Sequence, residues 1–313
     1  MPGTHSTDSR TVMTGSRGRG IALAFGTALI SGVSVFVNSY GVRVVRDATV
    51  YTTAKNLVAA VVLVFLMIGT RRSVPALRLP RRQRLGLLAV AVAGGSVPFV
   101  LFFSGLARAS SVHAAFVQKT LVIWVALLAV PILGERLGIL HYAAIGLLLA
   151  GQTALGGGLA GFRFGAGEWM ILAATLLWAV EVILVKRLVG AIPPDVLAVA
   201  RMGLGVVLLI GWVAVSGHWS ALIGLTGEGW RWAVLTGLLL GGYVATWYRA
   251  LALAPAVDVT AVLVVAAVIT AALDAIVNGK DLTPQTAAGI LLLAAGAGLV
   301  TVARSRRTPV SAA

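Results

Sequence analysis

The sequence of 313 residues contains no cysteine, few acidic residues and little charge of any kind. The absence of cysteine excludes disulfides, cysteine-based metal sites and thiol catalysis. Charged residues make up only 11% of the chain and hydrophobic residues 59%, whereas about a quarter of the residues in soluble proteins are charged. The mean hydropathy of +0.97 therefore indicates a protein that folds in lipid.

Apolar stretches of about twenty residues, the length of a helix that crosses a bilayer, recur along the chain. Ten spans are predicted, at 20–41, 49–70, 85–107, 111–133, 138–157, 167–189, 194–216, 230–251, 255–277 and 284–303. Residues 1–19, rich in Ser, Thr, Gly and Arg, are predicted to be a disordered cytoplasmic tail, and residues 304–313 a second cytoplasmic tail.

The 25 Lys and Arg residues are distributed unevenly between the two predicted faces. With the N-terminus inside, sixteen lie on cytoplasmic segments and six on outer ones, so the positive-inside rule predicts that both termini are cytoplasmic. A basic rim of this kind holds the orientation and contacts anionic membrane lipid. The same distribution argues against a nucleic-acid partner.

The chain also matches itself at a fixed offset. Residues 106–151 align without a gap on residues 251–296, 145 residues later, with fifteen identities in forty-six pairs, where chance gives roughly a tenth. Two units of five spans each, 20–157 and 167–303, must run in opposite directions through the membrane. The predicted fold is therefore all-α, with ten transmembrane helices as two inverted five-helix repeats, typical of secondary transporters. Duplication without transport is the alternative.

Small residues and prolines mark places where helices pack closely or bend. The small residues recur every four positions at Gly20, Ala24, Ala28, Gly32, and again at Gly237, Gly241. They favour close helix contact over substrate binding. Pro98 lies mid-span and removes a backbone donor, which leaves a carbonyl for water or a ligand or makes a plain kink.

Three ionisable residues lie deep within predicted spans, where charge is expensive. Lys119 is about 5 Å from the midpoint of its span by helical rise, and its counterpart in the second repeat is Val264. It is predicted to meet an anionic substrate group or a buried carboxylate in a cavity, or to form a structural ion pair. Glu181 and Arg201 flank a helical hairpin at equal distance, which predicts a salt bridge or a carboxylate that titrates during transport.

Other polar and aromatic residues give weaker predictions. Asp274 and Lys55 lie near the outer ends of their spans and are expected to reach water, although Asp274 remains a candidate coupling carboxylate. His113 and Asp258 occupy matching positions at helix starts, where polar residues are usually caps or interface groups. Four aromatic residues could either line a cavity or belong to the core and the interfacial belts of aromatic residues. They are Trp178, Trp124, Tyr243 and Trp247.

Motifs for enzymes and ATP-driven pumps are missing. The sequence has no G-x-x-x-x-G-K-[ST] phosphate loop, no H-E-x-x-H and no G-x-S-x-G elbow. The chain is thus not expected to be an enzyme or to bind a cofactor or metal ion.

Short motifs resemble those of a known family. Gly134-Glu135-Arg136-Leu137 closes the fourth span, Gly279-Lys280-Asp281-Leu282 closes the ninth, and Trp178-Ala179-Val180-Glu181 leads to Lys186-Arg187 in the sixth. Together with the two repeats, they resemble the EamA-type branch of the drug/metabolite transporter superfamily. Because Lys280 replaces the acidic residue in the second copy, the motif is expected only to terminate a helix.

The resemblance implies a secondary carrier with a substrate cavity between the repeats. The expected function is export of a small amphipathic metabolite, such as an amino acid, across the plasma membrane, with or without proton coupling through Glu181 or Asp274. Lys119, Glu181, Arg201, Trp178, Trp124 and Tyr243 are the predicted substrate-binding residues. Efflux of cationic drugs and a non-transporting scaffold or accessory subunit are the alternatives. The sequence leaves the oligomeric state open.

Overall fold

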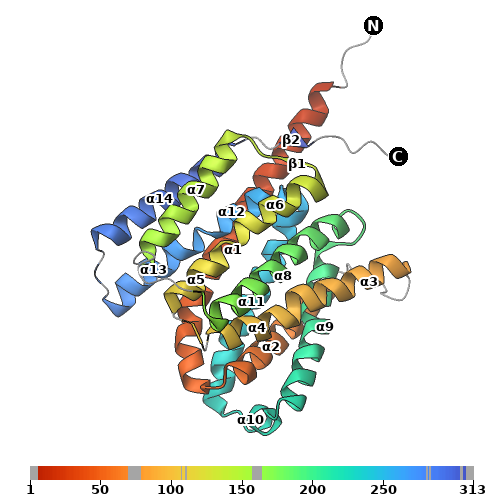
Figure 1. Ribbon diagram of the computed structural model, residues 1–313. Helices are drawn as coiled ribbons and strands as arrows, with labels where there is room; N and C mark the ends of the chain where they lie inside the picture. The colour runs from red at the N-terminus through yellow and green to blue at the C-terminus, as the bar shows by residue number, and fades with distance from the viewer. Residues whose placement is uncertain are drawn as a thin grey trace.

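A computed structural model describes residues 6–69, 79–106, 108–109, 111–156, 164–279, 281, 283–303 and 306–307. The chain forms a bundle of helices in which the first turns of the N-terminal helix and residues 306–307 lie at the same end (Figure 1). This end is called the terminal end below. The opposite end, where the short α10 (Trp219–Ile223) lies, is called the far end.

The first repeat runs from α1 to α7. Its elements are α1 (Ser6–Val45), α2 (Ala48–Gly69), α3 (Arg81–Val90), the π-helix η2 (Ala91–Ser96), α4 (Val97–Leu106), α5 (Ser111–Lys119), α6 (Leu121–Leu133) and α7 (Ile139–Leu155). The helix α1 begins inside the segment 1–19, so the prediction of a disordered tail up to residue 19 is wrong for its C-terminal part. Contacts made by Arg17, described below, hold that part in place.

The second repeat runs from α8 to α14. Its other elements are α8 (Ala166–Leu188), α9 (Pro194–Val215), α11 (Gly227–Leu253), α12 (Ala256–Leu263), α13 (Ala266–Asn278) and α14 (Pro284–Val302). Two short strands, β1 (Glu135–Arg136) and β2 (Arg306–Arg307), pair antiparallel with Glu135 opposite Arg307. They join the end of the fourth predicted span to the C-terminal segment.

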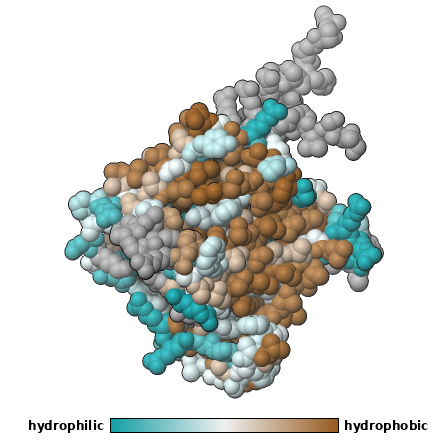
Figure 2. Space-filling view, viewed as in Figure 1, coloured by the Kyte–Doolittle hydropathy of each residue, from teal (hydrophilic) through white to brown (hydrophobic). Residues whose placement is uncertain are grey.

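Within the described residues, eight helical segments are long and apolar enough to cross a membrane. They coincide with eight of the ten predicted spans. At the other two positions the structure has α7, an apolar helix of 17 residues, and α11, a helix of 27 residues. Large apolar side chains such as Phe65, Leu127 and Leu291 are exposed, and hydrophobic residues cover much of the face in Figure 2. Such a surface is expected against lipid.

Both repeats interrupt the fourth of their five predicted spans at the same place. The first break lies at Thr120, between α5 and α6, and the second at residues 264 and 265, between α12 and α13. The Lys119 position of one repeat corresponds to Val264 in the other. Both broken helices end at a glycine in the left-handed conformation, Gly134 with φ 66° and Gly279 with φ 63°, which an L-residue with a Cβ adopts only at a cost.

The helices pack in equivalent ways in the two repeats. The helix α1 lies against α11 and α13, as α8 lies against α4 and α6. A Cβ atom on Gly32 would be 2.6 Å from Cβ of Ile269, and one on Gly237 would be 2.6 Å from Cβ of Val58. The predicted small-residue surfaces are therefore helix contacts, as expected.

Candidate functional site

Glu181 and Arg201 form a buried ion pair in the interior. Oε1 of Glu181 is 3.1 Å from Nε of Arg201, and the residues are 2% and 5% exposed. The hydroxyl of Tyr248 donates a hydrogen bond to the same carboxylate oxygen. Nε and Nη1 of Arg201 have no aligned hydrogen bond within the described residues. The carboxylate is thus shared between two partners, and the guanidinium keeps donor capacity.

The π-helix η2 makes room for this pair. A Cβ atom on Gly94 would be 2.4 Å from Cδ of Glu181, and one on Gly95 would be 2.1 Å from the carbonyl oxygen of Arg201. Only glycine fits at both positions, and π-bulges often mark functional sites. Sequence reasoning missed these residues, although two adjacent glycines shortly before the mid-span Pro98 were a usable signal.

The proline also explains how Trp178 is held. Pro98 has no N–H to donate to the carbonyl of Gly94 four residues earlier. The indole Nε1 of Trp178 lies 3.4 Å from that oxygen and donates to it. The carbonyl predicted to be available for water or a ligand is therefore taken by a predicted site residue.

Aromatic rings surround the ion pair. Trp178 packs edge-on against Phe99, with ring centroids 5.7 Å apart. The guanidinium of Arg201 lies 6.0 Å from the centroids of Phe99 and Tyr248. Tyr243 stacks on Trp247 at 6.0 Å and lies within electrostatic range of Arg201. The structure thus brings together four predicted site residues: Glu181, Arg201, Trp178 and Tyr243.

Lys119 and Trp124 belong to the first helix break instead. Lys119 is the last residue of α5 and is partly buried, and it has no hydrogen bond or ion pair within the described part of the chain. The indole of Trp124 donates to Oγ1 of Thr120 at 3.1 Å, and that hydroxyl donates to the carbonyl of Val117. A cation at the carbonyl end of a helix is favoured by the helix dipole.

Two residues expected to reach water lie in different surroundings. Lys55 is only 7% exposed, so that expectation is wrong: α4 and α11 cover α2 there. Its Nζ donates to Oδ1 of Asn38 at 3.1 Å. Asp274 is partly exposed and accepts a hydrogen bond from Nδ2 of Asn278 at 2.7 Å. It lies toward the far end of α13 and does not join the cluster around Glu181.

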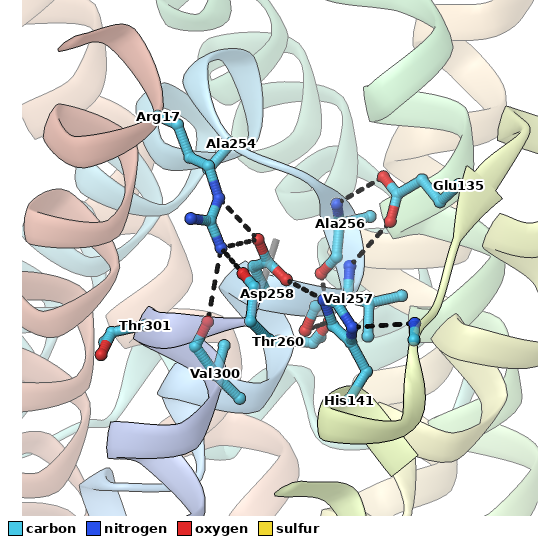
Figure 3. Close-up of polar contacts among 12 residues, drawn as sticks. Arg17, Glu135, His141, Ala254, Ala256, Val257, Asp258, Thr260, Val300 and Thr301 are labelled. Atoms are coloured by element: carbon cyan, nitrogen blue, oxygen red, sulfur yellow. Dashed lines mark hydrogen bonds and ion pairs between the residues drawn. The ribbon is translucent and has the colours of Figure 1, made fainter. Parts of the chain in front are cut away.

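At the terminal end, Asp258 is fully buried at the start of α12. Its Oδ2 accepts from Nε and Nη2 of Arg17 at 3.1 and 2.9 Å, and Nη2 also donates to the carbonyls of Val300 and Ala303 (Figure 3). Nε2 of His141 is 3.4 Å from Oδ1 of Asp258. These contacts tie α1, α7, α12 and α14 together.

The turn between α11 and α12 is clamped from both sides. Glu135 accepts hydrogen bonds from the N–H groups of Ala256 and Val257 at 2.7 and 3.2 Å (Figure 3). Nζ of Lys186 donates to the carbonyls of Leu251 and Ala254. An anion at a helix start and a cation at a helix end both match the helix dipoles. Burial raises the pKa of Glu135 above its ordinary value, and the two N–H groups and Lys186 act in the opposite direction.

This clamp corrects one prediction. Glu135 was expected only to help terminate a helix, but it caps a helix of the other repeat. A cap needs an acceptor, which lysine cannot supply, so Lys280 is not an equivalent residue in the second copy. Lys280 lies outside the described residues.

At the far end, His113 occupies the position in the first repeat that Asp258 has in the second, and it makes a weaker contact. Nδ1 of His113, near the start of α5, is 3.3 Å from Oε1 of Glu168 in α8. Glu168 also accepts from the N–H of Gly165 at 3.0 Å, so it caps its own helix. This tie carries charge on both partners only when the imidazole is protonated.

Comparisons with known proteins agree with this architecture. A sequence model described as the EamA-like transporter family matches residues 18–155 and 165–302, one match for each repeat. No curated protein matches the chain. A solved crystal structure, titled only as that of a protein, superposes with a TM-score of 0.74 at 21% identity, covering 90% of this chain and 96% of the other. At that identity the likeness shows the fold alone.

Proposed function

We propose a carrier function from the premise that the chain belongs to the EamA-like transporter family, a family of multi-pass membrane transporters with two repeats. The protein is a secondary-active or facilitative carrier of the plasma membrane. It exports a small amphipathic metabolite with an anionic group, such as an amino acid, by alternating access between the repeats.

The topology follows the same proposal. We assign α7 and α11 as the fifth and eighth of ten spans, because α7 packs along α14 and α11 along α1 and α2. The terminal end is then cytoplasmic, in agreement with the excess of Lys and Arg on that side. Reporter fusions after residues 217 and 303 should give outside and inside signals, respectively.

Lys119 is the observation that supports an anionic substrate group. Burying an ammonium group without a counter-charge costs several kcal/mol, and Lys119 has no carboxylate partner within the described residues. Half-helix ends at mid-membrane are where secondary transporters hold substrates and ions. A carboxylate bound at the break, between Lys119 and the N-terminal end of α6, would supply the missing charge.

Alternating access requires that the two ends open in turn. The terminal end is held by Arg17–Asp258 and by the clamp of Glu135 and Lys186, which are largely buried. The far end has more exposed ties: His113–Glu168, His218–Asp47 and the hydrogen bond from Tyr40 to Asn278. An arrangement closed at the terminal end and easier to open at the far end fits release of an exported substrate.

Proton coupling is proposed through Glu181, with facilitated exchange as the competing scheme. Glu181 contacts both a cation and a hydroxyl in the interior, while Asp274 lies toward the far end. Arg201→Ala should change the pH dependence of transport if Glu181 exchanges a proton. An unchanged profile would leave facilitated exchange.

Reconstituted protein provides the main test. Purified protein is reconstituted into liposomes, which are then loaded with labelled amino acids, organic acids or cationic dyes. Efflux of each solute is followed with and without a pH gradient. Lys119→Met should reduce efflux of anionic or zwitterionic solutes at least tenfold, and Lys119→Arg should retain part of it. Arg231→Met, which removes an exposed cation, is the matched control.

The outcomes separate the alternatives. Dye efflux that survives Lys119→Met would favour a cationic drug carrier anchored at Glu181. No flux of any solute, by protein that keeps its fold, would overturn the carrier function in favour of a scaffold.

A further inference from the structure

Two carboxylates at the far end share one arrangement. Asp47 precedes α2, and its Oδ1 accepts hydrogen bonds from the N–H groups of Thr49 and Val50 at 3.0 Å each. Glu168 lies in the first turn of α8, and its Oε2 accepts from the N–H of Gly165 at 3.0 Å. Each carboxylate thus caps the start of its own helix with one oxygen and presents the other oxygen to a second partner.

The second partner is a histidine in both cases. Nδ1 of His218, which lies between α9 and α10, is 2.5 Å from Oδ2 of Asp47. Nδ1 of His113 is 3.3 Å from Oε1 of Glu168. His113 and Asp47 belong to the first repeat, whereas His218 and Glu168 belong to the second. Both pairs therefore join one repeat to the other.

Both of these histidines are accessible to water. The side chain of His218 is 42% exposed and that of His113 is 21% exposed, whereas His141 at the terminal end is 2% exposed. Histidine is the side chain whose charge ordinarily changes between about pH 5 and pH 8, and arginine stays charged throughout. The two ion pairs at the far end therefore depend on pH, whereas Arg17 at the terminal end stays charged beside Asp258.

Other charged groups near the two pairs do not replace the histidines. Arg108 follows α4, which packs against α5 and α8, and it donates to the carbonyl of Ser104. The charged residues on the elements adjoining His218 are Arg43, Arg46, Lys55, Glu228 and Arg231. Within the described part of the chain, the ion pairs of Asp47 and Glu168 are those with the two histidines.

Protonation of the histidines strengthens both contacts. A neutral imidazole can donate one hydrogen bond to a carboxylate, but an imidazolium donates a charge-assisted bond that is roughly twice as strong. The arrangement with the far end closed thus binds protons more tightly than one in which the repeats have separated there. By linkage, a lower pH favours the closed arrangement and a higher pH favours the open one. The hydrogen bond from Tyr40 to Asn278 adds a contact without a histidine.

We infer that His113 and His218 form a pH-sensitive latch between the two repeats at the far end, which acid closes and alkaline pH releases. The inference rests on the proposed carrier function, in which the far end faces the outer medium and opens to release the substrate. Protons outside the membrane then slow release at this end. This regulation is separate from any proton that Glu181 exchanges during transport.

Cysteine labelling tests the latch, because the chain has no cysteine of its own. Val117→Cys places a reporter on α5, one turn after His113, and Val50→Cys places one in the first turn of α2. Both valines are buried, at 2% and 1% exposure, so their thiols become reactive when the far end opens. Thr260→Cys, at a residue that is 2% exposed, is the corresponding reporter at the terminal end.

Labelling by a thiol reagent is measured on the purified full-length protein in detergent at about pH 5.5 and about pH 8, on either side of the ordinary titration of histidine. Each rate is divided by the rate for the unfolded protein at the same pH, which removes the pH dependence of the thiol itself. A partly exposed ion pair shifts an equilibrium by up to about fivefold, so the far-end reporters should label roughly threefold or more slowly at the lower pH. The terminal-end reporter should show the same normalised rate at both.

Variants of the two histidines identify the groups responsible. His113→Gln with His218→Gln cannot gain charge, so labelling at the lower pH should rise to the rate seen at the higher pH. His113→Arg with His218→Arg is charged at both pH values and should label slowly at both. His141→Gln changes a histidine at the terminal end and is the matched control, which should retain the pH effect.

Two results would overturn the latch: no pH effect in the protein with both histidines, or a pH effect that survives the double glutamine change. If the glutamine variant unfolds, which rapid labelling of Thr260→Cys would reveal, the arginine variant decides. Slow labelling of that variant at both pH values supports the latch, and fast or pH-dependent labelling overturns it.

Labelling in detergent requires no transport, so the latch and the carrier function can fail separately. A pH effect that depends on the two histidines, in a protein that moves no solute in liposomes, would support the latch and overturn the carrier. Solute efflux by a protein whose far-end labelling does not depend on pH would support the carrier and overturn the latch.

Discussion

The two ends of the bundle differ in how their buried charged side chains are paired. Toward the terminal end, Arg17 pairs with Asp258, Arg201 with Glu181, and Arg249 with Asp195. Toward the far end, Lys55 and Lys119 have no carboxylate partner among the described residues, and Glu168 and Asp47 are each paired with a histidine.

The difference is notable because the repeats make the two ends geometrically similar. Asp258 and His113 are 145 residues apart and start equivalent broken helices, yet one anchors a permanent ion pair and the other depends on protonation. A duplicated scaffold thus carries charges that are not duplicated. Among the described residues, the terminal end has carboxylate-paired cations, whereas two cations toward the far end, Lys55 and Lys119, lack a carboxylate partner.

The largest expected effect comes from Glu181. Glu181→Gln leaves the Arg201 guanidinium buried without a counter-charge, which should reduce the free energy of unfolding by roughly 3 kcal/mol. The double variant Glu181→Gln with Arg201→Met removes both charges and should recover most of the loss. Unfolding in detergent measures all three proteins. A double variant as unstable as the single one would show that the pair is not the cause.

Asp258→Asn should have the next largest effect. Because Arg17 keeps some contact with water and with two carbonyls, we expect the free energy of unfolding to fall by about 2 kcal/mol. For His113→Gln at the far end, we expect it to fall by less than about 1 kcal/mol. The chain has no cysteine, so Thr260→Cys on α12 is a single reporter. Thiol reagents should label it faster in the Asp258→Asn background. Equal labelling, or equal losses at the two ends, would contradict the comparison.

Glu135→Gln tests the clamp more gently. The amide retains one acceptor but places donors near the N–H groups of Ala256 and Val257, which should cost about 1 kcal/mol, the scale of a charge-assisted hydrogen bond. Glu228→Gln, at an exposed position in the first turn of α11, should stay within about 0.5 kcal/mol of the unmodified protein. Melting temperatures of the two variants provide the check, and equal shifts would argue against a cap.

Lys119→Met should change stability least. No partner is lost and a partly buried charge is removed, so the melting temperature should stay constant or rise while transport of anionic solutes falls. A marked destabilisation would mean that Lys119 has a structural partner, and the contrast between the two ends would weaken.

Much of the fold could be predicted from residues close together in sequence. The length of the apolar stretches predicted the spans, and the self-match at an offset of 145 residues predicted the repeat. Gly134 and Gly279 marked the ends of both broken helices. Two of the ten predicted spans are not among the eight helices long and apolar enough to cross a membrane, since α7 is short and α11 carries Glu228, Arg231 and Arg249. The Glu181–Arg201 pair could be found because one hairpin fixes their depths.

The rest of the candidate site depends on contacts between distant segments. Lys55 seemed close enough to water by its position in α2, but packing against α4 buried it. The role of Glu135 needed the start of α12, 121 residues later, and no local pattern encodes that contact. The π-helix arises where Gly94 and Gly95 meet Glu181 and Arg201, so its cause also lies in other helices.

By itself, the sequence determined that the chain lies in a membrane, that it is duplicated, and that Lys119, Glu181 and Arg201 lie deep within their spans, because these follow from composition, spacing and helical rise. Only the tertiary structure decided which of those charges have partners. Pairing depends on which helix faces are brought together, and some of those faces come from segments as far apart in the sequence as Arg17 and Asp258.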